Sequence, residues 1–125
     1  MIEARDLGQI IGKRVAKVMV NPASVSLSFG DGGWLLVECG FILKMIGSVV
    51  MGSANIPESA VALLCCENQK VNDVRFDGIG LLTLFFENEQ FLHLIPERDG
   101  LESYVLHTKH GIIPIINFPE DISRK

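Results

Sequence analysis

Two similar strand–turn–strand segments dominate this sequence and restrict its fold to one rich in antiparallel β-structure. The clearer segment is Leu81–Leu94, in which two apolar stretches flank the turn residues Glu-Asn-Glu-Gln. The segment Ser26–Val37 matches it at a shift of 57 residues and has Gly-Asp-Gly-Gly as its turn. Apolar residues spaced by two are typical of half-buried strands, and glycine tolerates the positive φ that tight hairpins need. The coinciding apolar positions are Leu27 with Leu84, Phe29 with Phe86, Trp34 with Phe91 and Val37 with Leu94.

The match extends towards the N-terminus of each segment at a shift of 56 residues. There Leu7 falls on Leu63, Gly12 on Asn68, Val15 on Val71 and Val18 on Val74. Glycine and asparagine both tolerate the left-handed conformation that ends many helices. We therefore expect an internal repeat, approximately residues 7–45 and 63–106, in which each copy reads helix, strand, strand, strand. Both copies would lie in one domain spanning residues 1–125, a length that can bury a sizeable core.

The two helices of this scheme have separate signals. Residues 3–11 carry apolar positions at helical spacing and stop at Gly12. Pro57 and Glu58 are typical of a first helical turn, with Asn55 as a candidate N-cap and the helix running to about Asn68. Between the copies, residues 41–45 are expected to continue the sheet, whereas residues 47–53 suit a strand and a loop equally well.

The remaining strands follow directly from alternation and turn residues. Residues 13–20 are expected to form a half-buried strand with Ala16, Val18 and Val20 on one face. Residues 102–107 and 112–116 form the last two strands, and Pro114 argues for an edge position, where dimerisation is possible. The fold class is α+β, mainly β: a curved antiparallel sheet, closed as a half-barrel or a sandwich, with two short helices packed against it.

Composition and charge exclude several classes of protein. A formal net charge of −4 argues against nucleic-acid binding and favours a basic protein partner or no charged partner. The apolar stretch 40–56 contains Lys44 and is too short to span a bilayer, so no membrane association is expected, and the N-terminus is no signal peptide. The three cysteines, two of them adjacent, are interpreted as reduced thiols of a cytoplasmic protein.

No constellation of residues predicts catalysis, a metal or a cofactor. His107 and His110 lie three residues apart but lack an acid or cysteine at a companion spacing, so a metal site is not expected. Cys65 and Cys66 lie in an apolar helix where burial makes a thiol inert, and Cys39 follows an acid. Gly78-x-Gly80 is too short and wrongly flanked for a phosphate loop. We therefore expect a protein without enzymatic activity.

The charge distribution is more informative than any single motif. The segment from Glu87 to Glu102 sums to −4, which equals the formal charge of the whole chain. Such a segment is either a solvated loop surface or a docking face for a basic partner, where charge speeds association and fixes orientation. The candidate partner-binding residues are Glu87, Glu89, Glu97, Asp99 and Glu102, with Tyr104 as an aromatic anchor.

Several motifs resemble a family of small bacterial β-rich domains. These are Leu7-x-x-Ile-Ile-Gly-x-x-Val15, Val25-x-Leu-x-Phe-x-Asp-Gly32, Leu82-x-Leu-x-Phe-x-Asn88 and Glu102-Ser-Tyr104. The family has repeated "G-x-x-V … L-x-F-x-D-G" units, and its members resemble immunity proteins of bacterial toxin systems, including the CdiI type of contact-dependent growth inhibition. This chain differs by having Asn88-Glu89 where the second Asp-Gly is expected and Tyr104 where a tryptophan is common.

The resemblance implies a cytoplasmic inhibitor that binds a cognate toxin domain, often a basic nuclease, and blocks its active site. The alternative is a small-ligand-binding domain that uses the concave face of the curved sheet, lined by Trp34, Phe91 and His93. Enzymatic activity is the least supported hypothesis, because the sequence shows no set of titratable groups that would converge in an active site.

Overall fold

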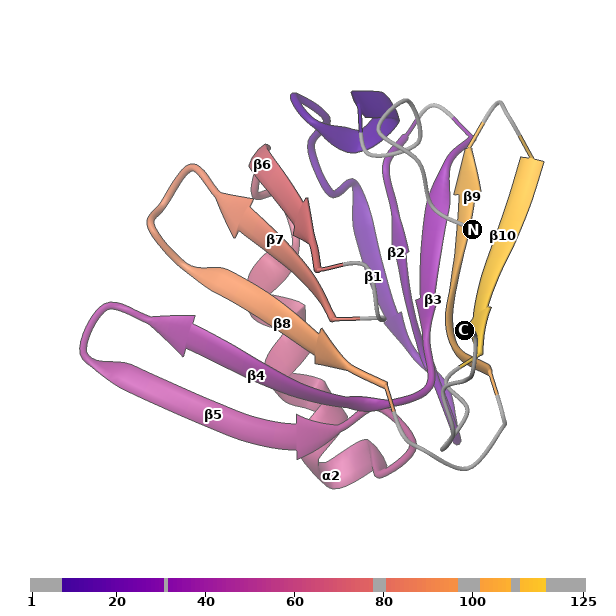
Figure 1. Ribbon diagram of the computed structural model, residues 1–125. Coiled ribbons are helices and arrows are strands. Elements are labelled where there is room, and N and C mark those ends of the chain that lie inside the picture. The colour runs from indigo at the N-terminus through magenta and orange to yellow at the C-terminus, as the bar shows by residue number, and fades with distance from the viewer. Residues whose placement is uncertain (1–7, 31, 78–80, 97–101, 109–110, 117–125) are drawn as a thin grey trace.

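The chain forms two five-stranded antiparallel sheets that face each other, with short helical segments beside them (Figure 1). The computed structural model describes residues 8–30, 32–77, 81–96, 102–108 and 111–116. The first sheet has the order β1-β2-β3-β9-β10 and the second the order β5-β4-β8-β7-β6. The strands of the first sheet are β1 Lys17–Val20, β2 Val25–Ser28, β3 Trp34–Val37, β9 Glu102–Thr108 and β10 Gly111–Ile116. Those of the second are β4 Gly40–Met45, β5 Ser48–Ser53, β6 Val71–Phe76, β7 Leu82–Phe86 and β8 Phe91–Ile95.

Each predicted hairpin is present and pairs in the expected way. In the first sheet Leu27 pairs with Leu35, and in the second sheet Leu84 pairs with Leu92. Each pair is fully buried, because alternation turns one side chain in two towards the core. The two turns are closed alike: Phe29 donates its N–H to the carbonyl of Gly33, and Phe86 donates to that of Gln90, each at 2.9 Å.

The two sheets exchange strands. After β3 the chain passes at Gly40 into the second sheet, where β4 pairs with β8. After β8 it returns to the first sheet, where β9 pairs with β3. The pairings are equivalent, since Phe41 lies opposite Leu94 in one sheet and Tyr104 lies opposite Val37 in the other. Residues 41–45 therefore do not continue the sheet of β1 to β3, as the sequence had indicated, but begin the link between the two sheets.

Backbone hydrogen bonds also join the two sheets through the segments that precede β1 and β6. Gly12 donates to the carbonyl of Val71 at 2.7 Å, and Asn68 donates to that of Val15 at 2.7 Å. Val15 in turn donates to Gln69 at 2.9 Å, and Val71 donates to Lys13 at 2.8 Å. An antiparallel bridge between Arg14 and Lys70 lies at the centre of this network.

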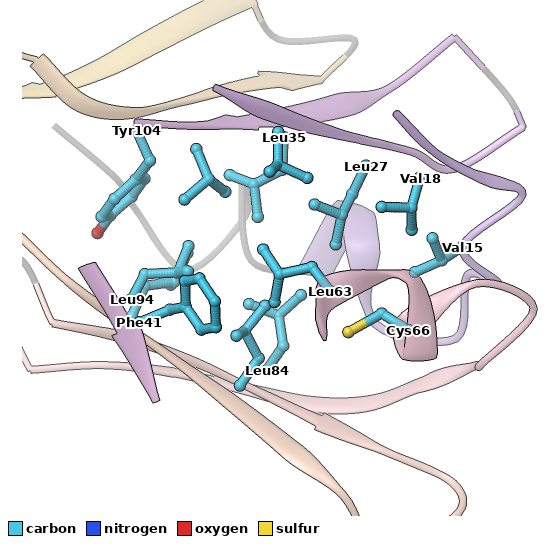
Figure 2. Close-up of a cluster of buried hydrophobic side chains, with 14 of the residues drawn as sticks. Val15, Val18, Leu27, Leu35, Phe41, Leu63, Cys66, Leu84, Leu94 and Tyr104 are labelled. Carbon is cyan, nitrogen blue, oxygen red and sulfur yellow. The ribbon is translucent and has the colours of Figure 1, made fainter. Parts of the chain in front are cut away.

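The core lies between the inner faces of the two sheets and includes residues of the helical segments (Figure 2). The side chains from the first sheet include Leu27, Leu35 and Tyr104, and those from the second include Phe41, Leu84 and Leu94. Leu63 and Cys66 fill the space towards the helical side. Full burial of each large apolar side chain stabilises the fold by about 1.5–3 kcal/mol. The described chain is thus mainly β, with antiparallel sheets arranged as a sandwich.

The helical segment after Pro57 differs from the expected single α-helix. The helix α2, Pro57–Ala60, begins after Ile56, which caps it without a side-chain hydrogen bond, so Asn55 is not the N-cap. It continues as a 3-10 helix, η1, Val61–Cys66. A 3-10 helix aligns residues three apart, and Ala60, Leu63 and Cys66 are all fully buried. Packing of this three-residue repeat against the core explains why the tighter helix forms.

The structure confirms some of the remaining expectations about helix ends and strands and contradicts others. Gly12 and Asn68 have φ of 88° and 71°, so both end their helical segments in the left-handed region as predicted. Of the helix expected at residues 3–11, residues 8–11 lie within the described chain, where residues 8–10 are helical and Ile11 already belongs to a turn. Ala16 is exposed rather than on the buried face with Val18. The unassigned residues 47–53 contain β5, an edge strand.

Candidate functional site

The structure describes only part of the predicted acidic face. Glu87 and Glu89 are exposed in the turn that joins β7 to β8. Glu97 and Asp99 lie outside the described residues, and Glu102 begins β9, where it pairs with Ile116. The acidic turn, which we define as residues 87–90, is therefore the part of the prediction that the structure describes.

Tyr104 is a core residue and not a surface anchor. Its side chain is fully buried, and it points towards Phe41 and Leu94 of the second sheet (Figure 2). Burial raises the pKa of its hydroxyl above the usual value. The expectation that Tyr104 contacts a partner is wrong, because β9 turns this position inwards between the two sheets.

Hydrogen bonds hold the acidic turn in a defined conformation. Glu87 donates its N–H to the carbonyl of Lys70 at 3.0 Å, and Glu89 donates to that of Phe86 at 3.1 Å. Gln90 is buried, and its Nε2 donates to the carbonyl of Cys65 at 3.2 Å. The turn is thereby fixed at one end to Lys70, the residue directly before β6, and at the other end to η1, so its two carboxylates project from a rigid base.

The two carboxylates of the turn have different surroundings. Glu87 Oε2 accepts a hydrogen bond from Arg14 at 2.8 Å, and the Arg14 and Glu87 side chains are 53% and 39% exposed. An ion pair as exposed as this one stabilises a fold by at most about 1 kcal/mol. The Glu89 carboxylate has no ion pair within the described part of the chain. Glu89 therefore presents its charge to the solvent.

An exposed apolar residue lies near the acidic turn. Lys44 pairs with Phe91, so the turn after β4 and the acidic turn before β8 emerge at the same end of the second sheet (Figure 1). Ile46 in the turn after β4 is 77% exposed. Sequence reasoning missed this residue, because the stretch around it could not be assigned. The signal that could have indicated a hairpin turn there is Gly47, which adopts a φ of 81°.

A cluster of rings covers the outer face of the second sheet. Phe91 contacts Phe85 and His93, with ring centroids 5.5 Å and 4.9 Å apart. Lys44 lies 5.3 Å from the Phe91 ring and Arg75 lies 5.4 Å from the Phe85 ring, which are cation–π distances. His93 Nδ1 is 2.8 Å from Thr83 Oγ1. Desolvation and, to a smaller extent, the charge of Lys44 lower the pKa of His93.

Trp34 does not join this cluster. It alternates with buried Leu35 and therefore lies on the outer face of the first sheet, where its ring stacks on His107 at 5.0 Å. The inner faces of both sheets are filled by the core. The structure thus does not bring Trp34 together with Phe91 and His93, and the three residues do not line one concave site.

The thiols provide no reactive group in the protein interior. Cys39, Cys65 and Cys66 form no disulfide with one another, and Cys65 is the exposed one of the three. Burial raises the pKa of Cys66 to about 12, with a further increase from Cys65 and a small decrease from its hydrogen bond with Gln90. A thiol with so high a pKa is not a nucleophile near neutral pH.

Within the described ranges, no three His, Cys, Asp or Glu side chains are grouped so that they could hold a metal ion. None of the helices in the described chain has the length and apolar character that crossing a membrane requires. Comparisons of the chain with protein-family models, with curated proteins and with solved structures found no match.

Proposed function

We propose that this chain is a non-catalytic inhibitor that binds a basic domain of a bacterial toxin, in the manner of an immunity protein, through its acidic turn. The observation that carries the proposal is the backbone of Glu89, a non-glycine residue with a φ of 69° at an exposed turn. The left-handed region costs an L-residue roughly 1–2 kcal/mol relative to its preferred conformations.

The equivalent turn in the first sheet supports a functional interpretation of this strain. Gly32 occupies the position that corresponds to Glu89 and has a φ of 96°. Glycine adopts this conformation without a steric penalty, so it is the residue that folding alone favours there. A glutamate at such a position adds charge to the surface at a cost in stability, and strained residues of this kind are concentrated at functional sites.

The neighbourhood of the turn suits recognition of a basic protein. The Glu89 carboxylate can pair with a cation of the partner. The Glu87 carboxylate can exchange its exposed ion pair with Arg14 for an ion pair with a second cation of the partner. Ile46 takes the place of Tyr104 as the exposed apolar contact beside these charges. Complementary charge of this kind increases the association rate and fixes the orientation of the two proteins. Such an inhibitor would act in the cytoplasm, where free thiols such as Cys65 stay reduced.

The test uses the protein domain encoded immediately upstream of this chain as the candidate toxin. Co-expression should rescue growth of cells that produce the toxin domain, and the two purified proteins should bind one to one. Glu89→Lys should weaken binding at least about tenfold and slow association more at low salt than at high salt. Glu58→Lys, which reverses an exposed charge in α2, is the matched control and should leave binding unchanged.

Glu89→Gly separates function from folding. It should leave the free energy of unfolding unchanged or slightly increased, because relief of backbone strain offsets the conformational entropy of glycine, while binding is weakened. Equal binding by wild type, Glu89→Lys and Glu89→Gly would refute the role of the acidic turn. Absence of both rescue and binding with the upstream domain would refute the immunity function for that partner.

A second candidate function is small-ligand binding on the outer face of the second sheet. The observation that favours it is the cluster of Phe85, Phe91 and His93 with flanking cations at Lys44 and Arg75. Such a surface suits a planar ring that carries a negative charge. A thermal-shift screen against metabolites would favour this function if a compound raised the Tm of wild type but not that of Phe91→Ala.

We also propose that the two halves of the chain, approximately residues 7–45 and 63–106, are copies of one unit. Support comes from the equal registers of β2–β3 and β7–β8 and from the reciprocal strand exchange. The backbone hydrogen bond from Gly12 to Val71 has a counterpart in the bond from Asn68 to Val15, because Gly12 matches Asn68 and Val15 matches Val71 in the two halves. The unit would be a helical turn followed by a three-stranded meander. The strand that follows each meander, β4 or β9, pairs with the last strand of the other meander.

A further inference from the structure

The edges of the two sheets differ in how they are protected against pairing with another strand. An exposed edge offers unpaired N–H and C=O groups, and most proteins block such edges with charges, bulges, proline or covering segments. At β1, Val18 donates its N–H to Glu67 Oε2 at 2.9 Å. At β6, a register shift lies between Val71 and Asp73, and Val74 donates to the Asp73 carboxylate at 2.9 Å. At β10, Pro114 has no N–H to offer.

Among the residues that the structure describes, none gives the strand β5 such protection over most of its length. It ends the second sheet and pairs with β4, whereas α2 covers only its C-terminal end. There Ser53 donates its N–H to Ser59 Oγ at 3.0 Å, and the same hydroxyl donates to the carbonyl of Ser53 at 2.9 Å. Because backbone groups alternate along a strand, the N–H and C=O groups of Val49 and Met51 point away from β4 as those of Ser53 do.

The side chains along this edge are apolar and exposed. Val49 is 55% exposed and Met51 is 73% exposed, on the same face of the strand. Residues 45–57 contain no charged residue, although the chain as a whole has a formal charge of −4. This is a place where two copies of an acidic protein can meet without opposing like charges.

We propose that β5 pairs in antiparallel fashion with β5 of a second copy of this chain, so that the second sheets of two protomers form one continuous sheet. A twofold axis through Val50 would place Val49 opposite Met51 of the second copy. The outward backbone groups of these two residues would then bond to each other, and their exposed side chains would pack across the junction. Self-pairing of one patch is the arrangement that a symmetric dimer requires.

The choice of a second copy over an unrelated strand rests on charge and on the pattern of edges. An edge strand that binds a basic partner is expected to have acidic side chains. The nearest charged residue on the face of Val49 and Met51 is instead Lys44, which lies over the Phe91 ring. The corresponding edge strand of the first sheet is β10, which contains Pro114 and is therefore a poor partner for another strand. Pairing through β5 alone joins two protomers, whereas pairing through both edges would join many protomers into an open-ended assembly.

The experiment measures the molar mass of the full chain by sedimentation velocity over about a hundredfold range of protomer concentration. We expect a concentration-dependent dimer. Met51→Lys retains the backbone and adds a charge at the junction, and it should weaken dimerisation at least about tenfold. Val49→Pro removes one outward N–H and should have a similar effect. The matched control, Met19→Lys, changes a methionine that is 47% exposed on the protected edge β1 and should remain dimeric.

Amide hydrogen exchange provides a second measurement of the same interface. The amides of Val49 and Met51 should gain protection as the protomer concentration rises, whereas that of Val50, which faces β4, should not change. A wild-type protein that is monomeric over the whole range would overturn the proposal. A dimer that Met51→Lys and Val49→Pro leave intact would place the interface elsewhere and would also overturn it. If the wild-type protein is monomeric and Met51→Lys loses binding to the toxin domain, the proposal is also overturned, and β5 is instead the edge that pairs with a strand of the toxin.

Discussion

The contact between β5 and α2 leads to a sharp prediction at Gly52. A Cβ atom added there would lie 2.8 Å from both Cβ and Oγ of Ser59 and 2.9 Å from Cζ of Phe41. Carbon atoms pack at about 3.5–4.0 Å, so Gly52→Ala must displace α2 or the core ring. Displacement of Ser59 would also strain its hydrogen bonds with Ser53.

The magnitude follows from three contributions. Overpacking costs about 1–3 kcal/mol and a weakened hydrogen bond about 1 kcal/mol, while the reduced entropy of the unfolded chain returns about 0.4–1 kcal/mol. The free energy of unfolding should therefore fall by roughly 2 kcal/mol, which corresponds to a Tm lowered by roughly 6–10 °C for a chain of this size. Urea denaturation followed by circular dichroism would measure the change.

Gly40 is the matched control for this substitution. It lies in β4 opposite Ser53, and a Cβ added there would meet only the carbonyl oxygen of Gly52, at an ordinary 3.6 Å. Gly40→Ala should change stability by less than about 0.5 kcal/mol. Ser59→Gly removes two of the three close atoms, so Gly52→Ala should cost less in that background. An unchanged urea midpoint for Gly52→Ala, or a cost that Ser59→Gly does not reduce, would refute the packing argument.

Two further predictions concern titratable groups. Cys65 should be the one thiol that reacts rapidly with a thiol reagent in the native protein, and Cys65→Ser should abolish the fast phase, because Cys39 and Cys66 are buried. The lowered pKa of His93 means that the unfolded chain binds its proton more readily than the folded chain does. The His93 contribution to stability is therefore complete above pH 6.5 and decreases as the pH falls towards the lower folded pKa. Urea midpoints at pH 7.5 and 5.5 should show this decrease in wild type and less of it in His93→Gln; an equal decrease in both would contradict the assignment.

The hairpins could be predicted because their signals are local. The alternation of Leu27 and Phe29 with serines identifies the buried face of that strand without reference to the rest of the chain. Gly12 and Asn68 were recognisable as helix ends because a positive φ requires particular residues. The position of Pro114 in an edge strand follows in the same way from its missing donor.

The exposure of the candidate site residues was predicted only in part. Glu87 and Glu89 are exposed at a turn, as hairpin geometry requires. Tyr104 was misplaced, because a strand residue faces inwards or outwards according to the register that its partner strand imposes. The same reasoning explains why Trp34 and Phe91, which occupy equivalent places in two hairpins, lie on the outer faces of different sheets.

Local features of the chain were sufficient to predict the strands, the tight turns and the predominance of antiparallel structure, since these depend on neighbouring residues and on the backbone preferences of a few residue types. The crossing of β4 and β9 between the sheets, the packing of Cys66 in a 3-10 helix and the position of β5 at the end of its sheet depend instead on contacts between distant segments. Pairing between distant strands is selected by the total apolar area that the sandwich buries. That total is a property of the assembled core, and no single segment of the chain contains it.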